Sequence, residues 1–168
     1  MREISEETFG SIHSFMKGLS DEQIPDFILR LSEKQPNIHS FIYHYLGAPD
    51  ADPKSLGMGG YLFAIIIRCY EYEYGEFQTI TQEIFSEFHN EKKKYLDNEL
   101  KRNSRNKVIS GLRRQAGQRV MIHYLDILMM GGIGVQSVFK DSEKESIKVA
   151  IYMIIIFLNA EMEKLFEL

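Results

Sequence analysis

The chain contains 168 residues, of which 44% are hydrophobic and 26% are charged, and its formal net charge is −4. This composition is close to the globular average and excludes a disordered or collagen-like chain, while the length suits one domain with a substantial hydrophobic core. The longest apolar stretches, residues 61–67 and 149–158, are much shorter than the roughly 20 residues of a membrane-spanning helix. We therefore expect a soluble protein without a membrane segment.

The single cysteine, Cys69, lies in an apolar run and cannot form a disulfide within the chain. A free cysteine in such a run is typical of a protein interior, and no histidine or other base lies nearby in sequence to activate it as a nucleophile. The lack of a possible disulfide indicates a reducing compartment. The N-terminal segment is acidic and lacks the apolar core of a signal peptide. These features together predict a cytoplasmic location.

In the first third of the chain, apolar residues recur at helical spacing. They predict helices over residues 9–18 and 24–31, the second introduced by a capping box at Ser20 to Gln23, and then a short helix that Pro36 opens. Residues 47–60 contain two prolines and four glycines, which predict a loop. This loop is the one candidate boundary, after an N-terminal helical subregion over residues 1–46.

Residues 61–74 predict a buried helix, although tyrosine and glutamate alternate from Tyr70 to Tyr74 in a way that a strand also shows. The preceding helical run and the glycine that follows favour the helix. A second capping box, Thr79 to Gln82, predicts a helix that either continues to Arg102 or breaks near His89.

Residues 104–130 predict a further helical segment, interrupted or bent at Gly111 and Gly117 and ended by the glycines of residues 131–134. A last helix then includes the apolar stretch near the C-terminus. No segment predicts a convincing strand. The sequence therefore predicts a single all-α domain over residues 1–168, a bundle of about six or seven helices.

Charge is sorted along the chain. Residues 1–91 hold six Lys/Arg and fifteen Asp/Glu, a net charge of −9, and residues 120–168 hold four against seven, a net of −3. Residues 92–119 hold ten Lys/Arg against two acidic residues, a net of +8. Apart from Arg119, the basic residues of this block are Lys92, Lys93, Lys94, Lys101, Arg102, Arg105, Lys107, Arg113 and Arg114. Near-neutrality thus conceals an acidic sector and a basic sector.

Three interpretations of the basic block compete. In the first, its cations pair with the acidic first half of the chain, either within the fold or in a symmetric dimer. In the second, they bind a protein partner by charge complementarity. In the third, they bind the phosphate backbone of a nucleic acid. The nucleic-acid interpretation lacks a known motif, and Tyr95 alone interrupts the basic run as an aromatic.

Polar side chains interrupt an otherwise apolar segment at Arg119, His123 and Asp126. On an ideal helix these positions lie within about 60° of one another. One interpretation is a catalytic cluster, in which Asp126 orients His123 as a general base and Arg119 binds a phosphate or carboxylate. The other is a structural network, because a buried polar strip must find partners.

The Arg119-x-x-x-His123 pair resembles the Arg-plus-His pairing of the helical, ribonuclease-like HEPN domains. Its spacing is shorter than is usual for that motif and no other feature matches, so we infer no membership of that family. The other histidines form no metal-binding motif, and neither glycine cluster matches a nucleotide-binding fingerprint. We therefore expect neither a metal nor a cofactor.

The sequence thus predicts a non-enzymatic interaction or regulatory module with segregated acidic and basic faces. Its expected partner is a protein or a second copy of the chain. The alternatives are a nucleic-acid-binding protein that uses Lys92 to Arg119, and a hydrolase or nuclease-like enzyme with a site at Arg119, His123 and Asp126.

Overall fold

The computed structural model describes residues 3–131 and 137–166. Within these ranges the chain forms eight α-helices and no strand, which confirms the all-α prediction. The helices are α1 (Glu6–Gly18), α2 (Gln23–Lys34), α3 (Pro36–Tyr45), α4 (Pro53–Tyr74), α5 (Gln82–Arg102), α6 (Arg105–Ala116), α7 (Arg119–Met130) and α8 (Asp141–Phe166). Among the described residues, no helix combines the length and the apolarity that a membrane span requires.

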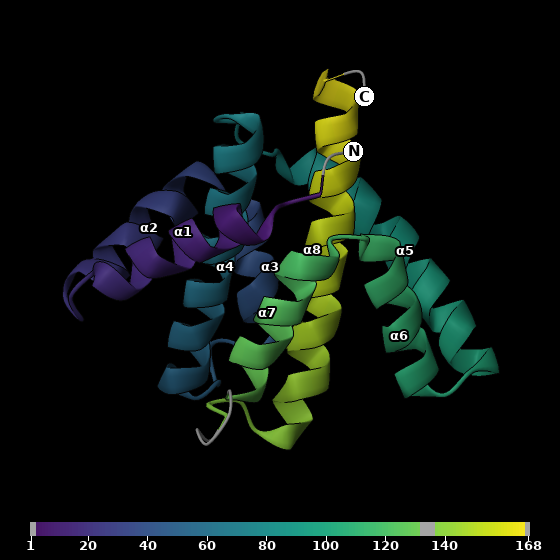
Figure 1. The fold of residues 1–168 in the computed structure, drawn as a ribbon. Coiled ribbons are helices and arrows are strands. Elements are labelled where there is room, and N and C mark those ends of the chain that lie inside the picture. Colours follow the sequence, from purple (N-terminus) through teal and green to yellow (C-terminus); the bar gives the residue numbers. More distant parts are fainter. Residues whose placement is uncertain (1–2, 132–136, 167–168) are drawn as a thin grey trace.

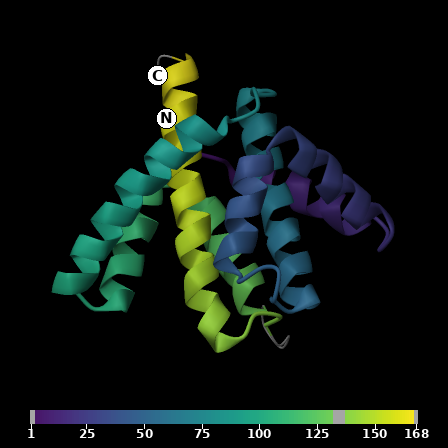
Figure 2. The same ribbon diagram turned by 180° about the vertical axis from the view of Figure 1, so that it is seen from behind.

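The two longest helices, α4 and α8, form the centre of the bundle. α4 packs against α1, α2, α3 and α8, and α8 also packs against α3, α5, α6 and α7. Residues 62–67 of α4 and residues 150–155 of α8 are at most 1% exposed. Figure 1 shows α1 and α2 on one side of this centre and α5 and α6 on the other, and the view from behind shows the same separation (Figure 2). The two apolar stretches of the sequence are therefore the core of the fold.

The helix ends explain why the bundle has one helix more than expected. Gly117 adopts a left-handed φ of 68° and divides the predicted segment of residues 104–130 into α6 and α7, whereas Gly111 lies inside α6 without breaking it. A residue with a side chain is strained at such a φ, so glycine is suited to this corner. Gly131 ends α7 as predicted, and residues 132–134 of the predicted turn lie outside the described residues.

Two ambiguous segments are helical. The alternating tyrosines and glutamates from Tyr70 to Tyr74 are the last residues of α4, so the strand alternative is wrong. α5 continues through His89 to Arg102 without a break. Its N-cap is Thr81, whose side chain accepts a hydrogen bond at 3.4 Å from the backbone three residues on, so the cap lies two residues after the predicted Thr79.

The loop predicted over residues 47–60 is wrong in its second half, because α4 begins at Pro53. Asp52 caps this helix by accepting a hydrogen bond, at 2.8 Å, from the backbone N–H two residues on. Gly59 lies inside α4, where an added Cβ atom would come within 2.5 Å of the Leu46 side chain. The glycine therefore allows α3 and α4 to approach closely and does not form a turn.

Asn159 of α8 is the centre of a buried hydrogen-bond network. Its Oδ1 accepts hydrogen bonds from the Tyr70 hydroxyl of α4 and, at 3.3 Å, from the Gln118 side-chain amide. Its Nδ2 donates to the carbonyl of Ala116 at 2.7 Å, and Gln118 accepts from the backbone N–H of Ile4 at 2.7 Å. These five residues are at most 8% exposed. The network thus joins the N-terminal segment, α4 and α8 to the corner between α6 and α7.

Cys69 is completely buried on α4, as the sequence predicts. Burial raises the pKa of its thiol to about 12, because the charged thiolate is disfavoured away from water. The thiolate is the nucleophilic form of cysteine. The structure therefore argues against a reactive cysteine.

Replacement of Asn159 by leucine would leave the Gln118 amide and the Ala116 carbonyl without this partner and weaken the bonding of the Tyr70 hydroxyl. A buried polar group left unsatisfied costs about 1–3 kcal/mol, so we expect Asn159→Leu to lower the free energy of unfolding by about 3 kcal/mol. Urea unfolding measures this change. Asn98→Leu, on the exposed surface of α5, is the matched control and should change stability by less than about 0.5 kcal/mol. Equal stability of the two variants would contradict a structural role for the network.

Candidate interaction site

The basic segment folds into a helical hairpin, residues 82–116, which we call the arm. At its base, Phe85 packs edge-to-face against Phe41 of α3 and Phe157 of α8, with ring centroids 5.1 and 5.0 Å apart. Leu96 is the next buried residue along α5. Figures 1 and 2 both show the arm diverging from α8 toward the turn between α5 and α6. The arm is therefore anchored by aromatic contacts at its base and by packing of α6 against α8, while its ribbon diverges from α8 toward the turn.

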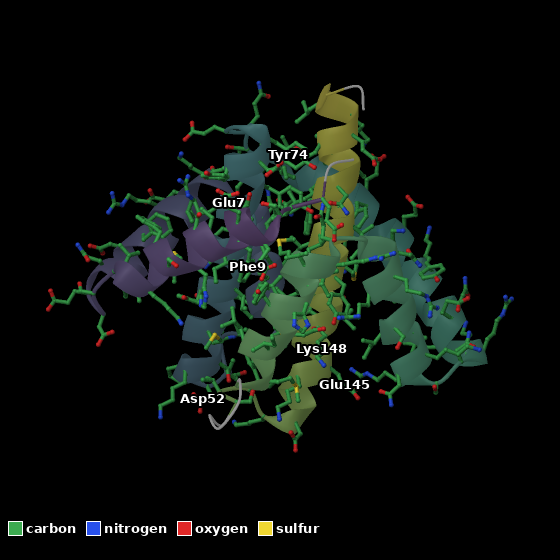
Figure 3. All side chains as sticks on the ribbon, viewed as in Figure 1. Glu7, Phe9, Asp52, Tyr74, Glu145 and Lys148 are labelled. Atoms are coloured by element: carbon green, nitrogen blue, oxygen red, sulfur yellow. The ribbon has the colours of Figure 1, made fainter. Side chains whose placement is uncertain are left out.

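The nine basic residues predicted as an interaction surface all lie on the arm, namely Lys92, Lys93, Lys94, Lys101, Arg102, Arg105, Lys107, Arg113 and Arg114. Arg105 forms an ion pair with Glu145 of α8 (2.8 Å; Glu145 is labelled in Figure 3), and Arg113 forms one with Asp126 of α7 (3.2 Å). The Lys92 ammonium lies 5.9 and 5.8 Å from the centroids of two aromatic rings of α5. Within residues 3–131 and 137–166, the other six form no ion pair, so the acidic first half does not neutralise the arm inside one chain.

A cavity of about 500 Å³ lies between the arm and the helices α3 and α8, and we call it the arm groove. Its α5 wall includes a single stripe of residues, His89, Lys93, Leu96 and Leu100, at intervals of four, three and four. Val108 and Ile109 of α6 and Val149 of α8 add apolar surface, and Arg105 of α6 adds a cation. Leu100 is 47% exposed. The groove therefore combines an apolar floor with cations at its edge.

Several exposed cations of the arm lie outside the lining of this groove. We call four of them, which lie near the α5–α6 turn or along α6 and form no ion pair within the described residues, the outer cations: Lys101, Arg102, Lys107 and Arg114. On α6, with about 100° per residue, Lys107 and Arg114 lie roughly opposite the face that carries Arg105 and Ile109. The arm thus has an inner face that lines the groove and an outer face that is basic.

Two histidines stand where α3 meets α5. His44 and His89 line both the arm groove and a neighbouring cavity of about 260 Å³. Burial, then repulsion from Lys93 and from His44, lowers the pKa of His89 below its ordinary value of 6.5. His89 is therefore neutral at pH 7, and Lys93 and Arg105 are the permanent cations of the groove, with Asp97 as its anion.

The structure does not connect the predicted catalytic residues as expected. Asp126 accepts a hydrogen bond from the Tyr152 hydroxyl at 2.6 Å and pairs with Arg113, and among the described residues no hydrogen bond joins it to His123. His123 is exposed, with its ring 5.6 Å from that of the next residue. Arg119 is exposed at the start of α7. Asp126 therefore does not orient His123 in this structure, and the catalytic interpretation of Arg119, His123 and Asp126 stays a prediction.

The start of α7 is instead bound by the N-terminal segment. One carboxylate oxygen of Glu3 accepts hydrogen bonds from the backbone N–H groups of Arg119 and Val120, at 2.8 and 3.3 Å. A negative charge is favourable at this end of a helix, where backbone donors are unpaired. This contact places Arg119 through its backbone and leaves its side chain at the surface.

The sequence did not predict the arm groove. His44 and His89 are far apart in the chain and belong to no motif. The signal that could have found the groove is the stripe His89, Lys93, Leu96 and Leu100, because these intervals place two polar and two apolar residues on one face of a helix.

The comparisons with known proteins assign no relative to this chain: no protein-family model, no curated protein and no solved structure matches it. In the part of the chain that the structure describes, no three His, Cys, Asp or Glu side chains come together as a group that could hold a metal ion. The functional inference therefore depends on the arm and its groove.

Replacement of Lys93 by methionine removes a positive charge near His89, so the pKa of His89 should rise toward 6.5. An NMR titration of the imidazole resonances measures this shift. Lys17→Met is the matched control, because Lys17 similarly lowers the pKa of His13 and should leave His89 unchanged. An unaltered His89 titration in Lys93→Met would contradict the proximity of the two groups.

The lowered pKa values of three histidines predict how the stability of the fold depends on pH. Burial is the first cause that lowers the pKa of His13, His39 and His89 below 6.5 in the folded protein. Between those lowered values and 6.5 the unfolded chain binds more protons than the folded protein, so acid favours unfolding. We therefore expect these histidines to make the free energy of unfolding fall as the pH drops below 6.5, and Lys93→Met to reduce their contribution to that fall, as measured by urea unfolding across this range.

Proposed function

We propose that this protein is a non-enzymatic interaction module that binds an acidic surface of another protein through the outer cations of its arm. The observation that carries this proposal is that all four outer cations are exposed and that none of them forms an ion pair within the described residues. Unpaired cations on a projecting hairpin are available to carboxylates of a partner, and their collective field speeds the encounter. The buried, unpaired Cys69 supports a cytoplasmic setting.

The first half of α5 favours a protein over a nucleic acid. Glu83, Glu87 and Glu91 are exposed there, at intervals of four residues. A stiff polyanion such as duplex DNA meets these carboxylates as it runs along the arm, whereas a flexible acidic polypeptide can contact the outer cations alone. A protein surface of mixed charge can also present cations to the carboxylates.

Nucleic-acid binding by Lys92 to Arg119 is the second candidate, and the density of unpaired cations near the α5–α6 turn supports it. An enzyme built around Arg119, His123 and Asp126 has less support. Arg119 and His123 are exposed and accessible to a substrate, but Asp126 is already held by Tyr152 and Arg113.

Charge reversal at three outer cations tests the proposal. The probe is fluorescently labelled poly-L-glutamate, and its binding is followed by anisotropy at about 0.1 M and about 1 M salt. We expect the unaltered protein to bind at the lower salt, and Lys101→Glu/Arg102→Glu/Lys107→Glu to bind at least about tenfold more weakly, since several exposed ion pairs of up to about 1 kcal/mol are lost together.

The matched control reverses three exposed cations elsewhere, Lys17→Glu/Lys54→Glu/Lys140→Glu, which alters the net charge equally. An equal loss of binding in both variants would mean that net charge and not the arm decides. Tighter binding of duplex DNA than of poly-L-glutamate, lost only in the arm variant, would favour the nucleic-acid candidate. A pull-down from native cells, repeated after nuclease treatment, would then identify the natural partner.

A further inference from the structure

The exposed face of α2 is an acidic stripe with an apolar centre. Glu22, Asp26, Leu29 and Glu33 follow one another at intervals of four, three and four residues, which places them within about 60° on one face. Leu29 is 56% exposed, and the three acidic residues are also exposed. None of these carboxylates forms an ion pair within the described part of the chain. We call these four residues the α2 stripe.

The arm groove presents the complementary pattern at the same spacing. His89, Lys93, Leu96 and Leu100 line it along α5, also at intervals of four, three and four residues, and Arg105 lines it beyond the end of α5. Both stripes span twelve residues, or about 16 Å of helix. When the two helices are aligned in parallel in this register, Asp26 faces Lys93 and Leu29 faces Leu96. Asp97, the anion of the groove, then falls opposite Arg30 of α2, whereas Arg105 is already paired with Glu145.

We infer that the arm groove binds the α2 stripe of a second copy of this chain. Leu29 enters the apolar floor, and Asp26 beside it pairs with Lys93 at the edge. This contact uses the inner face of the arm, so it is independent of the partner that we propose for the outer cations.

The two surfaces cannot meet within one chain. α2 packs against α3 and α4, and both views show α2 and the arm on opposite sides of α8 (Figures 1 and 2). The ion pairs of the arm within the described residues go to α7 and α8. Lys93 of the groove and the three carboxylates of the α2 stripe are therefore left without an ion-pair partner inside the described part of the chain.

The contact joins different surfaces of two molecules. Two copies that exchange it mutually form a closed dimer, and copies that do not close form longer chains. One helix in one groove buries less surface than a standard stable interface. We therefore expect association that depends on protein concentration and weakens with salt, because the outer edge of the contact is charged.

Sedimentation velocity on the full chain tests the inference. At about 10 μM to about 1 mM protein, which brackets weak contacts, we expect a mass above the 19.6 kDa of one chain at about 0.1 M salt. The mass should fall toward one chain at about 1 M salt, where the Debye length is about 3 Å. A single-chain mass at every concentration and both salts would overturn the inference.

A charge exchange identifies the surfaces. Asp26→Lys places a cation opposite Lys93, and Lys93→Glu places a carboxylate opposite Asp26, so each variant alone should associate at least about tenfold more weakly. In an equimolar mixture, a copy with Asp26→Lys can bind a copy with Lys93→Glu through two contacts. One contact pairs the two substituted side chains, and the other pairs the unaltered Asp26 with the unaltered Lys93. Recovery in the mixture supports the inference and also shows that both variants are folded.

Leucine replacements check the apolar part of the contact. Leu29→Ser should weaken association, whereas Leu165→Ser, at a leucine of α8 that is 60% exposed, should leave it unchanged. Association that survives Asp26→Lys and Lys93→Glu, or that the mixture does not restore, would overturn the assignment of the surfaces. Neither variant alters an outer cation, so failure here leaves the poly-L-glutamate result for the proposed function unaffected.

Discussion

The hydrogen bonds of Asn159 hold the parts of this bundle together. This side chain binds Tyr70 of α4, Gln118 at the corner before α7, and the carbonyl that ends α6. Because unsatisfied buried polar groups are costly, α4, α6, α7 and α8 cannot shift independently without breaking part of the network. Gln118 also binds the backbone of Ile4. The network therefore helps to fix the direction in which the arm leaves the body.

A second buried amide fixes the other end of the arm. Gln35, between α2 and α3, is 2% exposed. It accepts a hydrogen bond from the backbone N–H of Ile80 at 3.0 Å and donates to the carbonyl of Gln78 at 3.1 Å. These bonds hold the segment that leads into α5. The fixed base of the hairpin and the packing of α6 against α8 leave a groove between α5 and α8 that Leu96 and Val149 line.

This geometry explains why a nearly neutral chain keeps two charged surfaces. The central helices α4 and α8 separate the α2 stripe from the arm, as both views show (Figures 1 and 2). Exposed charges farther apart than a Debye length scarcely interact at physiological salt. The complementary charges of one chain are therefore available to bind other molecules. The proposals for the outer cations and for the arm groove both follow from this separation.

The sequence by itself determined the all-α class, the two central helices and the burial of Cys69, because helical periodicity and continuous apolar runs are local properties. It also determined that the cations of the arm are neighbours. Tertiary structure decided the rest. The sequence predicts that Gly59 lies in a loop. Only the structure shows that side chains at the end of α3 pack where a side chain on residue 59 would lie. Asp126 lies near His123 along the helix, yet Tyr152 of α8 and Arg113 of α6 bind it. The groove, likewise, requires α3, α5, α6 and α8 to meet, and such contacts between distant residues leave no periodic signal in the sequence.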